Sequence, residues 1–493
     1  MMKARGCDLL LLVVLWLVIS GSEGWSIGAH NHEEQEGNSS HGSQYYSSSG
    51  PSPAPYNGFF RPHGRIFSIL DFGAKGDGVS DDSMALLAAW KAACTVPEAT
   101  IEIPSNFIFL IKPITLQGPC KSNLVLKIDG TLLAPSNTST WSKSTRYQWL
   151  NLKWLSSLII QGSGTLDGQG SSWWNLTENT LQKQTEHSIS EMRPTILRFY
   201  QSCNLVVRDI QIINSPLCHL KFDNSRRVLV MNITISSPED SPNTDGIHLQ
   251  NSTGVEIRHS IIGCGREKKT PLQQTQMIPI NFPVHFMDVF NSFFELSGDD
   301  CVSIQTGCSN IHLHHLECSP SHGISIGGLG KGNSLACVSN VYANNINIQN
   351  ALSGVRIKTW QGGFGSVRNV TFSNIQVSDV QIPLVIDQYY CSKKSCKNKT
   401  DAVAISGISY KRIIGTYIYQ PMSLACSDSI PCIDIDIIDI QLFPALAERH
   451  SRQALCWNSY GRAVDPLKPS SIACLHKNNR QISPYTKPNG YIC

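Results

Sequence analysis

The sequence predicts an all-β protein, a parallel β-helix with one short helix over its N-terminal end. Short alternating runs of β-branched residues recur along the chain, each broken by Asn, Asp, Ser or Gly. One run starts at Leu205 and the next at Val228, and a later pair starts at Val338 and Val367. These spacings fall within the range of roughly 20–50 residues that is typical of solenoids. Short strands that recur with polar turns favour a β-helix over a β-propeller, whose blades need about 40 residues.

The N-terminal region is predicted to be removed or disordered. Residues 1–24 combine Lys3 and Arg5 with the apolar run Leu9–Ser20 and then small residues, which is the pattern of a secretory signal peptide. Residues 25–61 are rich in Ser, Gly, His and Pro and cannot bury a core, so we expect a disordered linker. We therefore expect a protein secreted to the extracellular region or cell wall.

The remaining residues, 62–493, are expected to form one β-helix domain. The helix is predicted in "SMALLAAWKAAC", with Asp81 or Asp82 as its cap. Residues 440–493 form a cysteine-bearing C-terminal extension that could brace the last coil.

Cysteines and sequons agree with secretion. One of the 17 cysteines lies in the signal peptide, and the other 16 are even in number, as a disulfide framework requires. The pairs Cys391/Cys396 and Cys426/Cys432 are close enough for local bridges. N-glycosylation is predicted at sequons in the domain and the linker, namely Asn38, Asn137, Asn175, Asn232, Asn251, Asn369 and Asn398.

The charge and hydropathy pattern excludes several partners. The formal net charge is only +3, and no basic run or base-stacking motif supports nucleic-acid binding. No second apolar span follows the signal peptide, so we expect no membrane partner, and we expect a monomer.

Adjacent carboxylates in "SGDDCVSIQTG" give the first indication of chemistry. Asp299 and Asp300 repel each other, and a solvated turn or a calcium ligand would be the ordinary explanation. A third carboxylate, Asp245, enters a strand one coil earlier. Equivalent positions on stacked coils lie about 4.8 Å apart, so the three carboxylates could converge on one face.

Later coils add an imidazole and two cations to the same face. They carry His322, and then Arg356 and Lys358, whose positions alternate along a strand and so point to one side of it. Carboxylates in a cleft are the groups that hydrolyse glycosides, and paired cations suit a sugar that itself carries a carboxylate. The pattern indicates hydrolysis of a uronic acid polymer.

Four short motifs resemble those of plant polygalacturonases, the pectin-degrading members of glycoside hydrolase family 28. They are "NTDG" at Asn243–Gly246, "GDDC" at Gly298–Cys301, "SHG" at Ser321–Gly323 and "RIK" at Arg356–Lys358. The resemblance covers roughly residues 67–432 and includes the opening "DFGAKGDGVSDD". The segment "SPSHG" departs from the family's commoner Gly-Pro-Gly-His-Gly, which affects the turn that carries His322.

The resemblance implies a right-handed β-helix that cleaves pectic polysaccharide with inversion and needs neither cofactor nor metal. It implies that Asp299 is the general acid, that Asp245 and Asp300 activate water, and that His322 tunes Asp299. The same resemblance implies the remaining assignments, which are Arg356 and Lys358 on the galacturonate carboxylate, Asn243 on sugar, Tyr390 at a subsite with Tyr389 as the rival, and a Cys301–Cys318 bridge.

One segment does not fit the repeat. The stretch from Asp245 to Asp299 is about twice the length of one coil, and the excess lies in Arg266–Gly298. This segment is either an inserted loop beside the active site or a translated intron, and we favour the intron. If it is genuine, we expect reduced or lost hydrolysis.

Other functions remain open at this point. A rhamnogalacturonan or xylogalacturonan hydrolase would share the fold, and a pectate lyase would need calcium. A wall-binding protein whose cleft is blocked by residues 266–298 is the alternative from a different class.

Overall fold

The computed structural model describes residues 64–142, 147–174, 193–238, 241–265, 299–391, 401–445, 452–476 and 493. Residues Gly64–Cys493 make one compact unit. The predicted signal peptide (1–24), the predicted linker (25–61) and the predicted insertion (266–298) lie outside the described residues.

Two parallel sheets form the unit, and every strand pairing in them is parallel. The narrower sheet has eleven strands, one from each successive coil. In stacking order they are β5 (Ile114–Gln117), β8 (Gln148–Lys153), β11 (Thr195–Tyr200), β14 (Leu220–Asp223), β17 (Ile247–Gln250), β19 (Val302–Ile304), β21 (Ile324–Leu329), β23 (Ser353–Trp360), β25 (Ile382–Tyr390), β27 (Met422–Ala425) and β29 (Leu455–Trp457).

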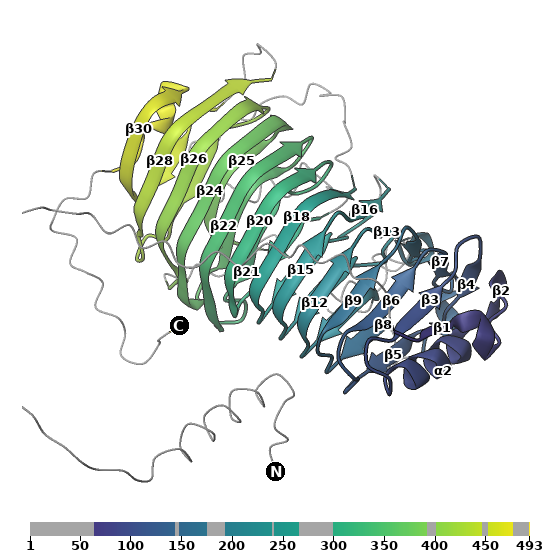
Figure 1. Cartoon of the computed structure of the whole chain (residues 1–493). Coiled ribbons are helices and arrows are strands. Elements are labelled where there is room, and N and C mark those ends of the chain that lie inside the picture. Colours follow the sequence, from purple (N-terminus) through teal and green to yellow (C-terminus); the bar gives the residue numbers. More distant parts are fainter. Residues whose placement is uncertain are drawn as a thin grey trace, which may run out of the picture. The chain divides into compact units, whose positions relative to one another are not determined.

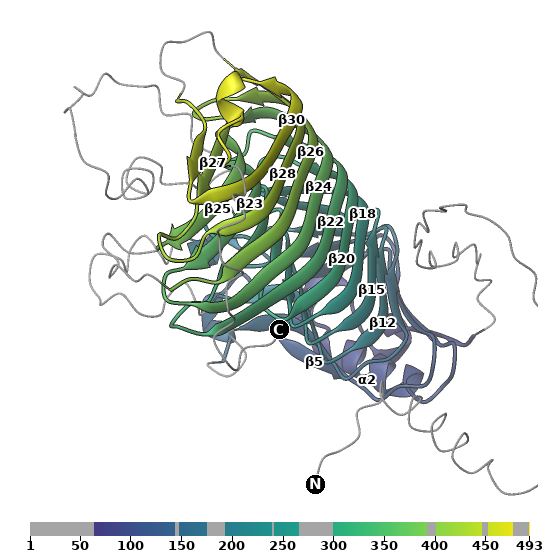
Figure 2. The same ribbon diagram turned by 90° about the vertical axis from the view of Figure 1, so that its left-hand side faces the viewer.

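The broader sheet has nineteen strands and wraps the rest of each coil. They are β1 (Ile66–Ser68), β2 (Asp77–Asp81), β3 (Thr100–Ile103), β4 (Ile108–Leu110), β6 (Leu124–Ile128), β7 (Thr131–Leu133), β9 (Leu158–Gln161), β10 (Thr165–Asp167), β12 (Cys203–Arg208), β13 (Gln211–Ile213), β15 (Arg226–Met231), β16 (Thr234–Ser237), β18 (Thr253–Cys264), β20 (Cys308–Cys318), β22 (Leu335–Gln349), β24 (Phe364–Val380), β26 (Ala404–Tyr417), β28 (Cys432–Pro444) and β30 (Ser459–Lys468). Figures 1 and 2 show the coils stacked from α2 at one end to β30 at the other. The predicted parallel β-helix is confirmed.

A column of left-handed residues bends each coil of the broader sheet. Successive members align in register and have φ values of 49–55°, which Asn, Asp and His tolerate better than most residues. The column runs through Asn232, His259, His315, Asn345 and Asn374. The polar corners of the repeat are therefore the positions where the chain must turn.

Apolar side chains fill the interior of the stack. Alternate residues of each strand point inward, as the burial pattern of β22 shows. Aromatic rings continue the stacking from coil to coil: Phe199 lies 4.9 Å from Phe222, and Phe372 lies 5.5 Å from Tyr410, measured between ring centroids. The core is a continuous column in which each coil depends on its neighbours.

The predicted helix closes the N-terminal end. Helix α2 (Ser83–Ala93) buries Leu86 and Trp90 against the first strands and the 3-10 turn η1 (Ile69–Phe72). Asp82 occupies the cap position, but its carboxylate accepts the N–H groups of Lys75 and Gly76 instead of capping the helix. Two short 3-10 turns, η2 (Thr138–Thr140) and η4 (Ser470–Ile472), lie in later connections.

The C-terminal extension adds a last coil. Strands β29 and β30 continue the two sheets, and the Cys456–Cys474 bridge joins β29 to the residues after β30. A second bridge, Cys337–Cys493, ties the terminal residue back to β22. These two bridges attach the extension to the stack.

Most described cysteines are paired. The bridges predicted at Cys426–Cys432 and Cys301–Cys318 form, and so does one between Cys94 and Cys120. Cys391 is also disulfide-bonded, while its predicted partner Cys396 lies outside the described residues. Pairing is not complete, however, because three buried cysteines remain as free thiols: Cys218, Cys264 and Cys308.

Four of the predicted glycosylation sites can be placed. They are exposed at the surface, namely Asn137, Asn232, Asn251 and Asn369. The sequons at Asn38, Asn175 and Asn398 lie outside the described residues. In the part of the chain that the structure describes, no helix is long and apolar enough to cross a membrane.

Candidate active site

Strand register brings the predicted residues together on the narrower sheet. Ile247 of β17 aligns with Val302 of β19, Val302 with Ile324 of β21, and Ile324 with Val355 of β23. The residues two positions earlier on three of these coils are Asp245, Asp300 and His322. The long stretch of chain between Asp245 and Asp299 therefore does not separate their coils, because β17 pairs directly with β19.

Asp300 is the most enclosed of the three carboxylates. It is 1% exposed. Its Oδ1 atom accepts hydrogen bonds from Ser325 Oγ at 2.7 Å and Arg356 Nη2 at 2.8 Å, and its Oδ2 atom accepts one from Lys358 Nζ at 3.0 Å. Two cations thus balance one buried carboxylate.

Asp299 lies next to His322. His322 Nδ1 is 3.3 Å from Asp299 Oδ1, which also accepts the backbone N–H of Asp300 at 2.9 Å. Burial alone would raise the pKa of Asp299, but the hydrogen bond and charge of His322, with the charges of Lys358 and Arg356, hold it well below its usual range. Asp299 is therefore ionised in the free site.

Asp245 has the opposite electrostatic environment. Burial, and then the negative charges of Asp299 and Asp300, raise its pKa well above its usual range. Its Oδ2 atom lies 3.1 Å from His248 Nδ1, and burial with the charge of Lys221 lowers the pKa of His248 to about 3, so the imidazole is neutral. These environments favour a proton on Asp245 over one on Asp299.

One backbone amide joins the two carboxyl groups. The N–H of Asp300 points at Asp245 Oδ1, at 3.3 Å, as well as at Asp299 Oδ1. The carboxyl groups of Asp245 and Asp299 therefore interact closely, and their apparent pKa values belong to the pair.

The two cations bind a carboxylate of the protein itself. The pKa values of Arg356 and Lys358 are both raised, because the attraction of Asp300, Tyr390 and Asp299 outweighs the cost of burial. Both side chains therefore stay charged. They were predicted to hold a substrate carboxylate, and in the structure they neutralise Asp300.

Comparison with known proteins agrees with this geometry. The model of "Glycosyl hydrolases family 28" matches residues 94–267 and 293–458. A polygalacturonase of Persea americana is 38% identical over 367 residues, which cover 74% of this chain and 71% of the relative. Polygalacturonase-2 of Solanum lycopersicum is 35% identical over 408 residues, covering 82% and 80%.

The chain belongs to glycosyl hydrolase family 28. It is a polygalacturonase-family glycosidase. The polygalacturonase structure from Erwinia carotovora ssp. carotovora has the same fold, with a TM-score of 0.59 and 20% identity over 82% of this chain and 97% of that one. The family match omits residues 268–292, which lie within the predicted insertion.

The family motifs contain glycines because the coils approach closely. A Cβ atom on Gly246 would lie 2.6 Å from the carbonyl oxygen of Cys301, and one on Gly323 would lie 2.0 Å from that of Ser353. Gly323 also has a φ of 79°. These two glycines let Asp245 and His322 sit directly against the next coil.

The subsite residues are placed as follows. Tyr390 lies beside Lys358, whose Nζ atom is 5.6 Å from the ring centroid, whereas Tyr389 hydrogen-bonds with Asp428. The contact with Lys358 favours Tyr390 over Tyr389 as the predicted subsite tyrosine. Asn243 is exposed on the turn before Asp245. Trp360 packs edge-on against Tyr390 at 5.1 Å and extends the aromatic surface.

Several site residues were not found from the sequence. His248 touches Asp245, Ser325 donates to Asp300, and Arg193 is buried and donates from Nη1 to the carbonyl oxygen of Pro242 at 2.8 Å. His248 could have been found, because it follows Asp245 by three residues, near the start of strand β17. No sequence pattern pointed to Arg193, because its contact is with Pro242, on a turn that is distant in the sequence.

The site is a poor place for a metal ion. Asp299, Asp300 and His322 do offer ligand atoms close to one another. However, both oxygens of Asp300 already bind Arg356 and Lys358. A bound cation would have to displace these two positive charges or lie against them.

We expect Asp300→Asn to destabilise the protein by about 3 kcal/mol, because removing one partner leaves buried charges unpaired. Denaturant unfolding measures the change. The matched control is Asp436→Asn, which breaks an ion pair with Arg462, whose side chain is 67% exposed. This change should cost much less, because the pair is exposed to solvent. Equal losses in the two variants would contradict the assignment of Asp300 as a buried counter-charge.

Proposed function

We propose that the chain hydrolyses α-1,4-galacturonosyl linkages of polygalacturonan, the backbone of pectin, with inversion of configuration. The observation that carries the proposal is the group of three carboxyls with two buried cations. Carboxyl groups supply the acid and the base of glycoside hydrolysis, and the cations recognise a negatively charged sugar. The relatives that share 35–38% identity over most of this chain are named polygalacturonases, which favours this substrate over branched pectins.

The proposed roles follow the positions of the groups. Asp299 protonates the glycosidic oxygen, and Asp245 and Asp300 hold and activate the attacking water. His322 orients and tunes Asp299, with which it is in contact. Arg356 and Lys358 bind the galacturonate carboxylate, and Asn243 and Tyr390 contact neighbouring sugar.

These roles require the proton to move when substrate binds. The electrostatics of the free site favour the proton on Asp245, whereas the proposed reaction needs it on Asp299. A substrate carboxylate on Arg356 and Lys358 would offset the positive charge that keeps the pKa of Asp299 low. Binding would thereby move the shared proton to Asp299 and leave Asp245 as the ionised base.

We also propose that the protein is secreted and acts at the cell wall. Its N-terminal residues have the pattern of a signal peptide, and its described part carries bridges such as Cys301–Cys318 and Cys94–Cys120. Disulfides persist in oxidising compartments. We propose that it acts as a monomer.

We expect Asp299→Asn to lower the hydrolysis of polygalacturonate by about 100-fold or more, the usual contribution of a general acid. Release of reducing ends measures the rate, and co-sedimentation with the polymer measures binding, which should persist. Asp436→Asn is the control and should keep full activity. Unchanged hydrolysis in Asp299→Asn would contradict the acid assignment.

The same assays separate the alternatives. Product absorbing in the short ultraviolet would indicate a lyase. Salt-dependent binding by the unaltered chain without reducing ends would favour the wall-binding protein.

A chain without residues 266–298 tests the insertion: we expect it to be the faster enzyme, and equal rates would contradict a blocking role.

We expect His322→Asn to shift the acid limb of the pH profile of kcat/KM to higher pH. The charge of His322 lowers the pKa of Asp299, so its loss raises that pKa. The Asp245–Asp299 pair then takes up a second proton at a pH that is higher by on the order of one unit. This second proton inactivates the pair. An acid limb that stays in place, or moves to lower pH, would contradict the proposed coupling.

A further inference from the structure

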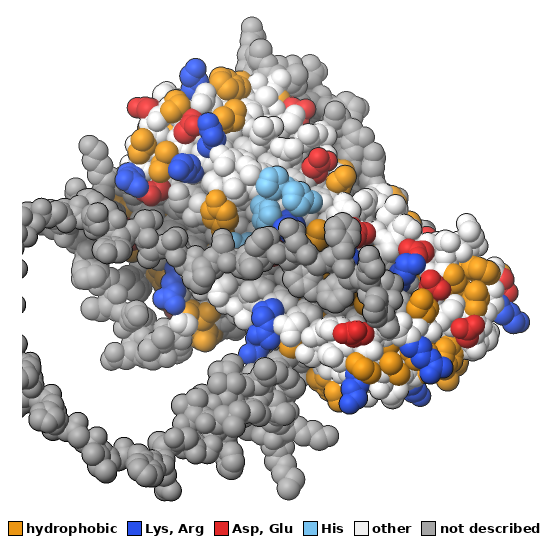
Figure 3. All heavy atoms as spheres, viewed as in Figure 1, with side chains coloured by type: hydrophobic (Ala, Val, Ile, Leu, Met, Phe, Trp, Pro, Cys, Tyr) orange, Lys and Arg blue, Asp and Glu red, His pale blue; other side chains and the backbone are white. Residues whose placement is uncertain are grey.

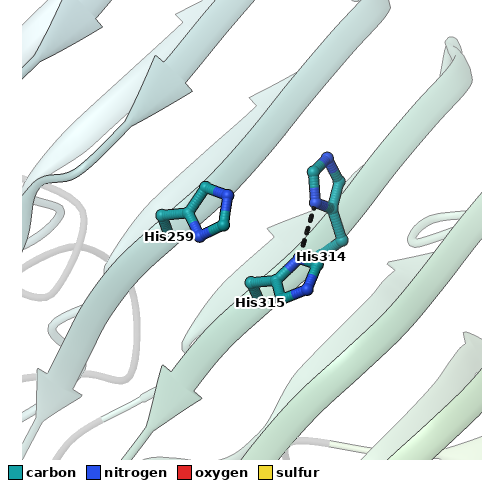
Figure 4. Close-up of side chains that lie close together, drawn as sticks. All are labelled: His259, His314 and His315. Atoms are coloured by element: carbon teal, nitrogen blue, oxygen red, sulfur yellow. Dashed lines mark hydrogen bonds between the residues drawn. The ribbon is translucent and has the colours of Figure 1, made fainter.

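Three histidines gather on the outer surface of the broader sheet, apart from the residues of the catalytic group. They are His259 on β18, and His314 and His315 on β20. Each offers one ring nitrogen, and these three atoms lie within 4.8 Å of one another. Figure 3 shows the histidines as one patch, and Figure 4 shows the three rings facing one another across the two strands.

The backbone explains why neighbouring histidines can share a face. Adjacent residues of a strand normally point to opposite sides. His315 has a φ of 55°, so the strand bends there and His314 and His315 come together, with their Nδ1 atoms 3.0 Å apart. His259 aligns with His315 on the adjacent coil, and their rings stack with centroids 4.8 Å apart.

A role in the left-handed column explains only part of this cluster. His259 and His315 occupy positions where other coils use Asn, and histidine tolerates this conformation. His314 lies outside the column. Its Nε2 atom is 3.2 Å from a carboxylate oxygen of Glu256, which belongs to β18.

The contact with Glu256 has the form that metal-binding histidines use. A ligating imidazole commonly donates its second N–H to a carboxylate, which fixes the tautomer and the ring orientation. A neutral His314 that donates its Nε2–H to Glu256 carries the lone pair on Nδ1, which faces His315. His259 and His315 are exposed and can rotate towards it.

We propose that His259, His314 and His315 form a binding site for a divalent transition metal ion of the zinc or copper class. Imidazole nitrogens suit these metals, whereas calcium and magnesium prefer oxygen. Tetrahedral zinc–nitrogen bonds of about 2.0–2.1 Å place the ligand nitrogens about 3.4 Å apart. The three ring nitrogens lie within 4.8 Å of one another, so small side-chain rotations bring them to this spacing. Water fills the fourth position. Glu256 is a positioning residue that holds His314.

A metal ion at this site would link strand β18, which precedes Asp299 and Asp300 in the chain, to strand β20, which follows them. Strand β18 ends at Cys264, whose carbonyl oxygen accepts the N–H of Asp299 at 3.1 Å. Strand β20 ends at Cys318, which is bonded to Cys301. A metal ion on the three histidines therefore joins the two strands between which the chain leaves at residue 265 and returns at residue 299.

The test is calorimetric titration of Zn²⁺ into the full, tag-free chain after treatment with a chelator, at pH 7.5. We expect one strongly bound ion per chain. His259→Gln and His314→Gln should each weaken binding at least tenfold, and Glu256→Gln should weaken it about 10-fold or more through loss of orientation. His312→Gln is the matched control, because His312 is an exposed histidine of the same strand outside the cluster, and it should bind zinc like the unaltered chain.

A second measurement guards against misfolded variants. Zinc should raise the thermal unfolding midpoint of the unaltered chain and of His312→Gln by a few degrees, but not that of His259→Gln. Without zinc, His314→Gln, Glu256→Gln and His312→Gln should unfold at the same temperature as the unaltered chain, whereas His259→Gln should unfold at a somewhat lower temperature because its φ of 49° suits Asn or His better than Gln. Absence of zinc binding at millimolar concentration would overturn the proposal. So would equal affinity in the unaltered chain and His259→Gln, because zinc would then lie elsewhere, for example at Asp299, Asp300 and His322.

Discussion

Each coil of the solenoid can satisfy its backbone hydrogen bonds only against the coils on either side, and this in-register pairing fixes the side chains of the site. The N–H of Gly246 donates to the carbonyl oxygen of Asp300, and the N–H of His322 donates to that of Asp299, both at 2.9 Å. A slip of one residue would turn every side chain to the other face. Close packing at Gly246 and Gly323 leaves little freedom for such a slip.

The same stacking sets the electrostatics of the carboxyl groups. Three acids from two coils would repel each other if all were ionised. Arg356 and Lys358 neutralise Asp300, and the raised pKa of Asp245 favours its protonated form. Asp299, the remaining carboxylate, lies beside His322.

Sequence patterns predicted the fold and the placement of the three carboxyls on neighbouring coils, because both depend on repetition. The spacing of β-branched runs indicated the coils, and equivalent positions on the coils placed Asp245 beside Asp299 despite the long segment between them. What the sequence could not predict are properties that arise from burial and from pairwise contacts. The pairing of both cations with Asp300 and the raised pKa of Asp245 both depend on burial and on close contacts between groups of different coils.

Other features were missed because the same residue type serves two purposes. The even cysteine count suggested a complete disulfide framework, yet Cys264 and Cys308 are buried as thiols in the core. His259 and His315 have the pattern of ordinary polar corner residues, and only their alignment with each other, and the contact of the neighbouring His314 with Glu256, indicates a ligand site. One sequence does not distinguish a bridged cysteine from a free one, or a corner histidine from a metal-binding one.

The most direct test of the account is the stereochemistry of the first product. Proton NMR of polygalacturonate during the first minutes of reaction distinguishes the anomers of the newly formed reducing end before they interconvert. An α-linkage hydrolysed by direct attack of water gives the β-anomer first, and this is the expected result. Initial release of the α-anomer would contradict the proposed roles of the three carboxyls, and the absence of any new anomeric signal would contradict hydrolysis itself.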